Sequence, residues 1–168
     1  MKWEEDLTLV DELLIDDVRN NSAWNQRWFV THRGLKSAPF SLDNAENEVQ
    51  YAIQKSSLDP YNESPWRYLI AIIKEQFRLI GGTEDFAAFV DACENSVLET
   101  KVTFEETTKK DGKECTHLIS AYIDILEMKG DEDSLDGAVK FAHDLETRYD
   151  PIRKKYWKMR ANQLQQSL

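Results

Sequence analysis

The fold can be predicted from two stretches of the chain, DVRNNSAWNQR at residues 17–27 and DPYNESPWRYL at residues 59–69. They match at an aspartate, an asparagine, a serine and a tryptophan, and Trp24 and Trp66 are 42 residues apart. In both copies an amphipathic segment precedes the motif, and the motif opens the next helix. We expect the asparagine and serine to cap that helix and the tryptophan to fill the gap between hairpins. Such a period predicts a repeat protein, because a single hairpin cannot bury its apolar face alone.

Apolar residues recur three or four positions apart along almost the whole chain, which predicts amphipathic helices. The inward faces of the first and last helices are expected to consist of Leu7, Val10, Leu14 and Val18, and of Ile152, Tyr156 and Met159. The chain has only six glycines and four prolines, and no segment alternates convincingly over strand length. We therefore predict an all-α fold: a right-handed superhelical stack of antiparallel helical hairpins, an α-α superhelix or TPR-like solenoid, with about eight helices.

We expect one helical-repeat domain over residues 1–168, with repeats at about 4–33, 42–80, 82–129 and 134–166. The stretch 98–113 is rich in Thr, Lys and Glu and contains the turn pair Asp111-Gly112, so it is expected to be a long mobile loop. Residues 34–39 are expected to form a second loop. Trp3, Leu9 and Ile15 lie off the main stripe of the first helix and suggest a second apolar surface there.

Composition excludes several functional classes. Of the 168 residues, 21 are Lys or Arg and 31 are Asp or Glu, and the net charge of −10 disfavours nucleic acid as a partner. No apolar run is long enough to cross a membrane, and the first residues do not form a secretory signal. The two cysteines, Cys93 and Cys115, match neither a disulfide framework nor a zinc-ligand spacing, which favours the cytoplasm.

No catalytic or ligand-binding constellation is found. The histidines, His32, His117 and His143, are far apart, and none has a second ligand at metal-binding spacing. We expect no catalytic, cofactor-binding or metal residue in this chain. The residues singled out are the motif positions Asn20, Trp24, Arg27, Asn62 and Trp66, as repeat residues or contacts to a partner subunit. For the tryptophans, packing between helices is the favoured interpretation.

Arg27 is open to two interpretations. An exposed guanidinium on a concave face can make a bidentate contact with a carboxylate of a partner protein. An internal ion pair with Asp16 or Asp17 is an equally good interpretation.

The repeat resembles the prenyltransferase alpha-subunit repeat, here Val18-x-Asn20-x-x-x-Trp24-x-x-Arg27 and Pro60-x-Asn62-x-x-x-Trp66. The second copy has Leu69 where the first has Arg27. The stretches at 17–30, 48–51, 62–66 and 152–157 are similar to the alpha subunit shared by protein farnesyltransferase and type I geranylgeranyltransferase. They occur in the family's order, whereas residues 81–112 carry little of the resemblance.

The resemblance implies the C-terminal part of a non-catalytic, structural alpha subunit. Its partner would be the beta subunit of a heterodimeric, zinc-dependent enzyme that attaches a farnesyl or geranylgeranyl group to C-terminal CaaX cysteines. Zinc is then expected on the beta subunit and not on this chain. The family's alpha-subunit residues near the diphosphate have no counterpart here. The alternative is a stand-alone helical-repeat adaptor. A truncated stack is also expected to self-associate through its first helix.

Overall fold

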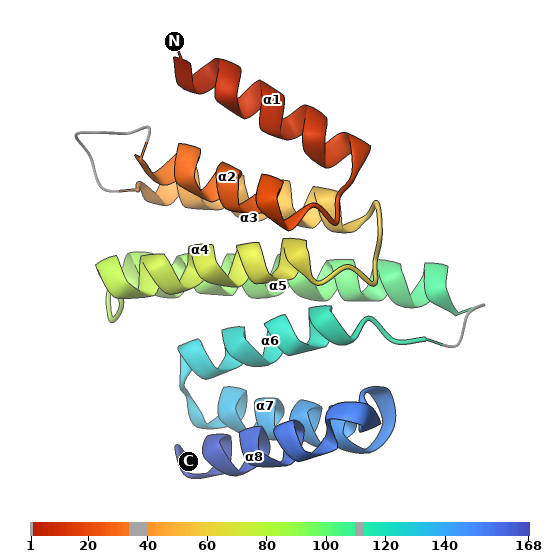
Figure 1. Ribbon diagram of the computed structural model, residues 1–168. Coiled ribbons are helices and arrows are strands. Elements are labelled where there is room, and N and C mark those ends of the chain that lie inside the picture. The colour runs from red at the N-terminus through yellow and green to blue at the C-terminus, as the bar shows by residue number, and fades with distance from the viewer. Residues whose placement is uncertain (1, 34–39, 110–112) are drawn as a thin grey trace. The chain divides into compact units, whose positions relative to one another are not determined.

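The computed structural model of the chain is built from helices (Figure 1). It describes residues 2–33, 40–109 and 113–168, with only the backbone of Lys2, Trp3 and Arg33. Its helices are α1 (Lys2–Asp16), α2 (Asn21–Arg33), α3 (Leu42–Ser56), α4 (Ser64–Ile80), α5 (Glu84–Thr108), α6 (Thr116–Lys129), α7 (Glu132–Asp144) and α8 (Lys154–Gln165). A π-helical turn (Leu145–Tyr149) and a 3-10 turn (Pro151–Arg153) join α7 to α8. The described residues contain no β-strand, which confirms the predicted all-α class.

Contacts divide the chain into two compact units, Met1–Gln76 and Phe77–Leu168, with the boundary inside α4. In the first unit α1 and α2 form a hairpin, and Val10 and Leu14 of α1 are 1% and 0% exposed, as their spacing predicts. Caps fix the helix starts. The side-chain oxygen of Asn20 accepts a hydrogen bond from the Ala23 amide at the start of α2, and Ser41 caps α3 in the same way.

The second unit runs from the last turn of α4 to the C-terminus. Each of its helices packs on the next, from α5 to α6, α7 and α8. The hydroxyl of Thr83 caps α5, and a carboxylate oxygen of Asp131 caps α7 by accepting from the Ser134 amide at 2.9 Å. Gly130 ends α6 in the left-handed region with φ of 73°, which glycine adopts without steric cost.

The predicted loop at 98–113 is wrong for residues 98–108, which continue helix α5 to Thr108. Threonine side chains make this possible, because the hydroxyls of Thr100, Thr103 and Thr108 donate to carbonyls one turn earlier. Phe104 is only 4% exposed and holds this part of the helix on its unit. The turn pair Asp111-Gly112, the loop at 34–39 and the Trp3 side chain lie outside the described residues.

The predicted inward face of the last helix is also wrong. Ile152, Tyr156 and Met159 are 96%, 44% and 48% exposed, whereas Trp157 and Leu164 are 1% and 0% exposed. Both sets have helical spacing, so periodicity alone did not decide between them. The second set is buried because the Trp157 indole is larger than any side chain of the first set. Ala161, which lies between Trp157 and Leu164, is small and lets the neighbouring helix approach closely. Among the described helices, none is long and apolar enough to cross a membrane.

Candidate functional site

The first motif closes on its own helix start. Asn20 caps α2, and the indole nitrogen of Trp24 donates to the carbonyl oxygen of Val18 at 2.8 Å. Trp24 is 4% exposed, and its ring packs against Tyr51 and Tyr68 at centroid distances of 6.0 Å and 5.1 Å. Trp24 therefore serves as a packing residue with a satisfied polar end.

The second motif is bonded directly to the first. The side-chain nitrogen of Asn62 donates to the same Val18 carbonyl at 3.0 Å, so this one acceptor joins both copies. Its side-chain oxygen accepts from the Ser64 amide at the start of α4. The hydroxyl of Ser64 donates to Asn21 at 2.6 Å. The matching residues of the repeat therefore connect α2 to α4, besides capping their own helices.

An ion pair also joins the first motif to the second. The guanidinium of Arg19 donates to a carboxylate oxygen of Asp59 at 2.6 Å.

Trp66 of the second motif is 2% exposed, which makes it one of the largest fully buried side chains. Both motif tryptophans therefore lie in the core of the first unit, in agreement with the packing interpretation.

Arg27 is not the exposed cation that one interpretation expected. The residue is 7% exposed, and its Nε and Nη2 donate to the two carboxylate oxygens of Glu48 at 2.7 Å and 2.8 Å. Its Nη1 donates to Asp11 at 2.9 Å. The bidentate partner thus belongs to the same chain. The internal interpretation is correct in kind, but the partners are Asp11 and Glu48 and not Asp16 or Asp17.

Tyrosines complete the network around this arginine. The guanidinium carbon of Arg27 lies 3.3 Å from the ring centroid of Tyr51, whose hydroxyl donates to Asp11. The hydroxyl of Tyr68 donates to Glu48 at 2.6 Å. Four elements, α1 to α4, thus contribute to one buried polar cluster, which we call the Arg27 cluster: Asp11, Arg27, Glu48, Tyr51 and Tyr68.

The electrostatics of the Arg27 cluster favour its bonded state. Burial by itself would lower the pKa of Arg27, but the hydrogen bonds and charge of Glu48 raise it above its ordinary value. Burial raises the pKa of Tyr68, and the negative charge of Glu48 raises it further. The pKa of Tyr51 is raised by burial and by its hydrogen bond to Asp11. Arg27 therefore stays charged and both tyrosines stay protonated, which suits a structural cluster better than proton transfer.

One member of this cluster, Glu48, could have been found from the sequence. Glu48 stands beside Val49 on the inward stripe of α3 and is 8% exposed. A carboxylate on an apolar stripe indicates a buried cation as its partner. Asp11, Tyr51 and Tyr68 gave no such signal, because each lies at the border of a stripe, and tyrosine is common in cores.

The second unit contains a partial copy of the motif that was not predicted and that keeps only the aspartate and the tryptophan of the four matching residues. Asp150 and Pro151 precede Trp157 with the spacing that Asp59 and Pro60 have to Trp66. The indole nitrogen of Trp157 donates to the Asp150 carboxylate at 2.8 Å. Its spacing was the available signal, but an arginine stands at the asparagine position and the copy does not follow the 42-residue period.

His32 lies between two aromatic rings at the end of α2. Its ring is stacked on Trp28 at 3.7 Å and on Phe40 at 4.1 Å between centroids. Burial lowers the pKa of His32, although a hydrogen bond with the Trp28 carbonyl acts in the opposite direction. Within the described part of the chain, no group of three or more His, Cys, Asp or Glu side chains could hold a metal ion.

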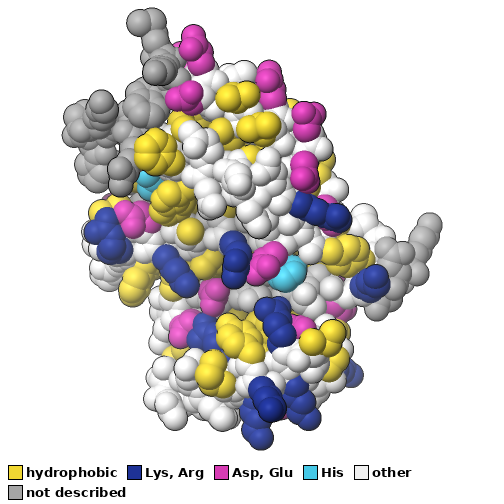
Figure 2. Space-filling view, in the orientation of Figure 1, with side chains coloured by type: hydrophobic (Ala, Val, Ile, Leu, Met, Phe, Trp, Pro, Cys, Tyr) yellow, Lys and Arg dark blue, Asp and Glu magenta, His cyan; other side chains and the backbone are white. Residues whose placement is uncertain are grey.

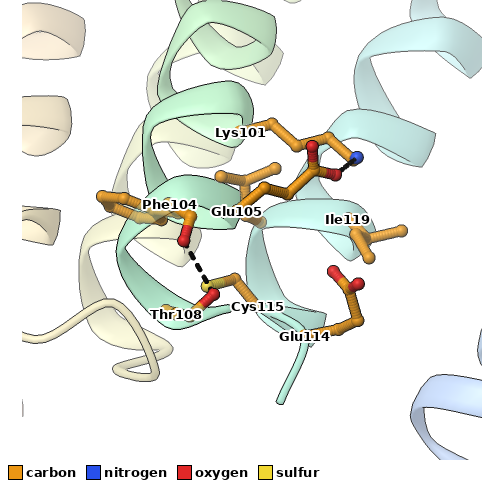
Figure 3. Close-up of a pocket in the computed structure, with 8 residues that line it drawn as sticks. Lys101, Phe104, Glu105, Thr108, Glu114, Cys115 and Ile119 are labelled. Carbon is orange, nitrogen blue, oxygen red and sulfur yellow. Dashed lines mark hydrogen bonds and ion pairs between the residues drawn. The ribbon is translucent and has the colours of Figure 1, made fainter. Parts of the chain in front are cut away.

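Two hollows in the described part of the second unit do not present a catalytic arrangement of side chains. A hollow between α5 and α6, next to buried Cys115, has a volume of about 10 Å³, enough for one water molecule at most (Figure 3). At its edge Lys101 pairs with Glu105 one turn away. A wider, mainly apolar hollow of about 440 Å³ is lined by Phe77 and Val90. The amine of Lys129 also lines it, but hydrogen bonds to Glu94 and Asp91 raise its pKa and keep it protonated, which does not suit a nucleophile.

Comparisons with known proteins agree with one another. A family model described as "Protein prenyltransferase alpha subunit repeat" matches residues 3–33. The protein farnesyltransferase/geranylgeranyltransferase type-1 subunit alpha of Dictyostelium discoideum is 33% identical over 99% of this chain and 46% of its own length. That of Pisum sativum is 31% identical over 98% of this chain and 50% of its own length. The chain thus spans about half the length of the curated relatives it matches.

A solved structure shares the fold. It is described as "Candida albicans protein geranylgeranyltransferase-I complexed with GGPP", and one of its chains matches with a TM-score of 0.66 and 21% identity. The match covers 95% of this chain and 46% of that chain. The predicted stack of helical hairpins is therefore confirmed.

Proposed function

Because this chain belongs to the family of protein prenyltransferase alpha subunits, we propose that it forms the C-terminal part of the structural alpha subunit of a heterodimeric protein prenyltransferase. The complete enzyme would attach a farnesyl or geranylgeranyl group to the cysteine of a C-terminal CaaX sequence. One observation carries the proposal: 33% identity with the Dictyostelium discoideum subunit over 99% of this chain.

A non-catalytic role for this chain is supported by how it uses its polar residues. The Arg27 cluster is buried and bonded internally, and the motif residues Asn20 and Asn62 cap helices and connect them. None of these groups is left facing a substrate. We propose that Asn20, Trp24, Arg27, Asn62 and Trp66 act on the subunit interface indirectly, by holding the hairpins that form it in position.

The partner is proposed to be the beta subunit, which would hold the catalytic zinc, the isoprenoid and most of the peptide site. The compartment would be the cytoplasm. We also propose that the isolated chain self-associates, since Leu9 and Ile15 of α1 are 55% and 65% exposed.

The experiment uses the chain alone and a chimera. In the chimera this chain replaces the matching half of the Dictyostelium discoideum subunit, and it is co-expressed with that organism's beta subunit. We expect no transfer to a CaaX peptide by the purified chain, and both co-purification and transfer with the chimera. As a matched pair, Arg27→Met in the chimera should reduce the yield of heterodimer, whereas Arg67→Met, at an exposed ion pair with Glu63, should not.

Two outcomes would overturn the proposal. Prenyl transfer by the purified chain alone would contradict its non-catalytic role. A folded chimera that does not bind the beta subunit would contradict the role as a subunit and favour the stand-alone adaptor.

A further inference from the structure

Helix α8, together with the 3-10 turn before it that contains Ile152, has an outward face that combines exposed apolar side chains with lysines. Ile152, Tyr156 and Met159 follow each other at helical spacing and are 96%, 44% and 48% exposed. Lys155 lies among them on the side of the helix opposite Trp157, and Lys158 is exposed one turn after Lys155. Exposed side chains of these kinds gather over the C-terminal helices in Figure 2. We call this surface the α8 face: Ile152, Lys155, Tyr156, Lys158 and Met159.

The cations of the α8 face differ from the arginines near them. Arg153 donates to Asp150 at 2.6 Å, and Arg160 donates to Asp124 at 2.8 Å. Lys155 and Lys158, by contrast, form no ion pair with any described residue. A net charge of −10 makes acidic groups plentiful on this chain, so a lysine surface without local carboxylates is available to an acidic partner.

Helix α1 has an outward face of the opposite charge. Leu9 and Leu13 are 55% and 40% exposed, and they are one turn apart on the side of the helix that borders the buried stripe of Val10 and Leu14. Glu5 and Glu12 lie next to them and are exposed without an ion pair to a described residue. Acidic and hydrophobic side chains lie side by side over α1 in Figure 2. We call this surface the α1 face: Glu5, Leu9, Glu12, Leu13 and Asp16.

We propose that the α8 face of one chain binds the α1 face of a second copy. Each face offers apolar side chains to bury and charges opposite to those of the other face. Two copies of the α1 face would place carboxylates against carboxylates, and two copies of the α8 face would place lysines against lysines. Contact between unlike faces is therefore favoured over contact between like faces.

One such contact leaves the α1 face of one copy and the α8 face of the other free. These two faces either pair with each other, which closes a dimer, or pair with further copies, which gives rings or open chains. The inference rests on the proposed self-association through α1, and it identifies the α8 face as the surface that α1 binds. It does not depend on the prenyltransferase role.

Sedimentation of the full chain over a range of concentrations tests the inference. The average mass should rise with concentration at low salt and fall when salt screens the charged contacts. The pair K155E/K158E on the α8 face should weaken association at least tenfold. The matched control K74E/K140E makes the same change in net charge on other helices and should have no comparable effect.

Charge swapping separates docking from a general effect on structure. The pair E5K/E12K on the α1 face should also weaken association at least tenfold, but an equal mixture with K155E/K158E should associate again, because unlike faces then meet with opposite charges. Ile152→Ser should weaken association without changing the unfolding midpoint at low concentration, because this side chain is exposed in the single chain.

Several results would overturn the inference. If K155E/K158E leaves self-association unchanged, the role of the α8 face is refuted, whereas self-association through α1 stands. A strict monomer at high concentration would refute both. Vesicles of anionic lipid that bind the α8 face of a monomeric chain would show that its partner is a membrane surface instead.

Discussion

Replacing Arg27 by methionine should be the most damaging single change in the first unit. Glu48 is 8% exposed, and the change would leave its carboxylate with only the Tyr68 hydroxyl as a described donor. Asp11 would also lose the hydrogen bond that Arg27 donates to it. Breaking a buried ion pair by removing one partner costs about 3–5 kcal/mol, because an uncompensated charge stays buried. We expect the free energy of unfolding to fall by that amount, measured by urea denaturation with circular dichroism.

A double-mutant cycle isolates the pair from the rest of the Arg27 cluster. Glu48→Met alone should also destabilise, whereas the double variant R27M/E48M should cost less than the sum of the single variants by about 2 kcal/mol or more. Buried ion pairs replaced by apolar residues on both sides are often close to neutral, which is the basis of this expectation.

Arg67 provides the matched control. It forms an ion pair with Glu63 at 2.8 Å, but its side chain is 79% exposed. Arg67→Met should therefore cost less than about 0.5 kcal/mol, as expected for an exposed pair one turn apart on a helix. Equal losses for the two arginines, or additive effects of R27M and E48M, would show that burial of the Arg27 pair is not what stabilises this unit.

Three further results are expected. Asn62→Ala should lower the free energy of unfolding by about 1–3 kcal/mol, because the part-buried Val18 carbonyl loses one of its two donors and α4 loses a buried side-chain bond at its start. Asn25→Ala on the exposed side of α2 should change it by less than about 0.5 kcal/mol, and equal effects in urea denaturation would argue against the link between motifs. Trp157→Ala should cost about 3–5 kcal/mol and Ile152→Ala less than about 0.5 kcal/mol, and the reverse order would restore the inward face expected from periodicity. Since burial lowers the pKa of His32 in the folded state, the unfolded chain binds the proton more tightly, so stability should fall as pH decreases below about 6.5; His32→Phe should reduce this slope, and an unchanged slope would show that His32 does not cause it.

Helix positions were predictable because each helix has a continuous apolar stripe or a clear stop signal. Ser41 and Thr83 cap their helices through side-chain oxygens, and Gly130 ends α6 in a conformation that favours glycine. The exception was the end of α5. Its threonines satisfy their hydroxyls on the helix itself, so their polarity did not indicate a loop.

The candidate site was predictable in its positions but only partly in its contacts. The paired motif identified Asn20, Trp24, Asn62 and Trp66, and the structure buries both tryptophans. The bond from Asn62 to the Val18 carbonyl could not be predicted, because it joins residues 44 positions apart through a backbone atom that no side-chain pattern marks.

The sequence by itself determined that this chain is a series of amphipathic helices with a repeated Asn…Trp start, because spacing and capping are local properties of the chain. Only the tertiary structure decided that Arg27 binds Glu48 internally and that Trp157, and not Ile152, faces inward. A guanidinium accepts any nearby carboxylate, and α8 has two apolar stripes of equal spacing. Which carboxylate and which stripe become buried depends on the helices packed against them, and that packing joins residues far apart in the sequence.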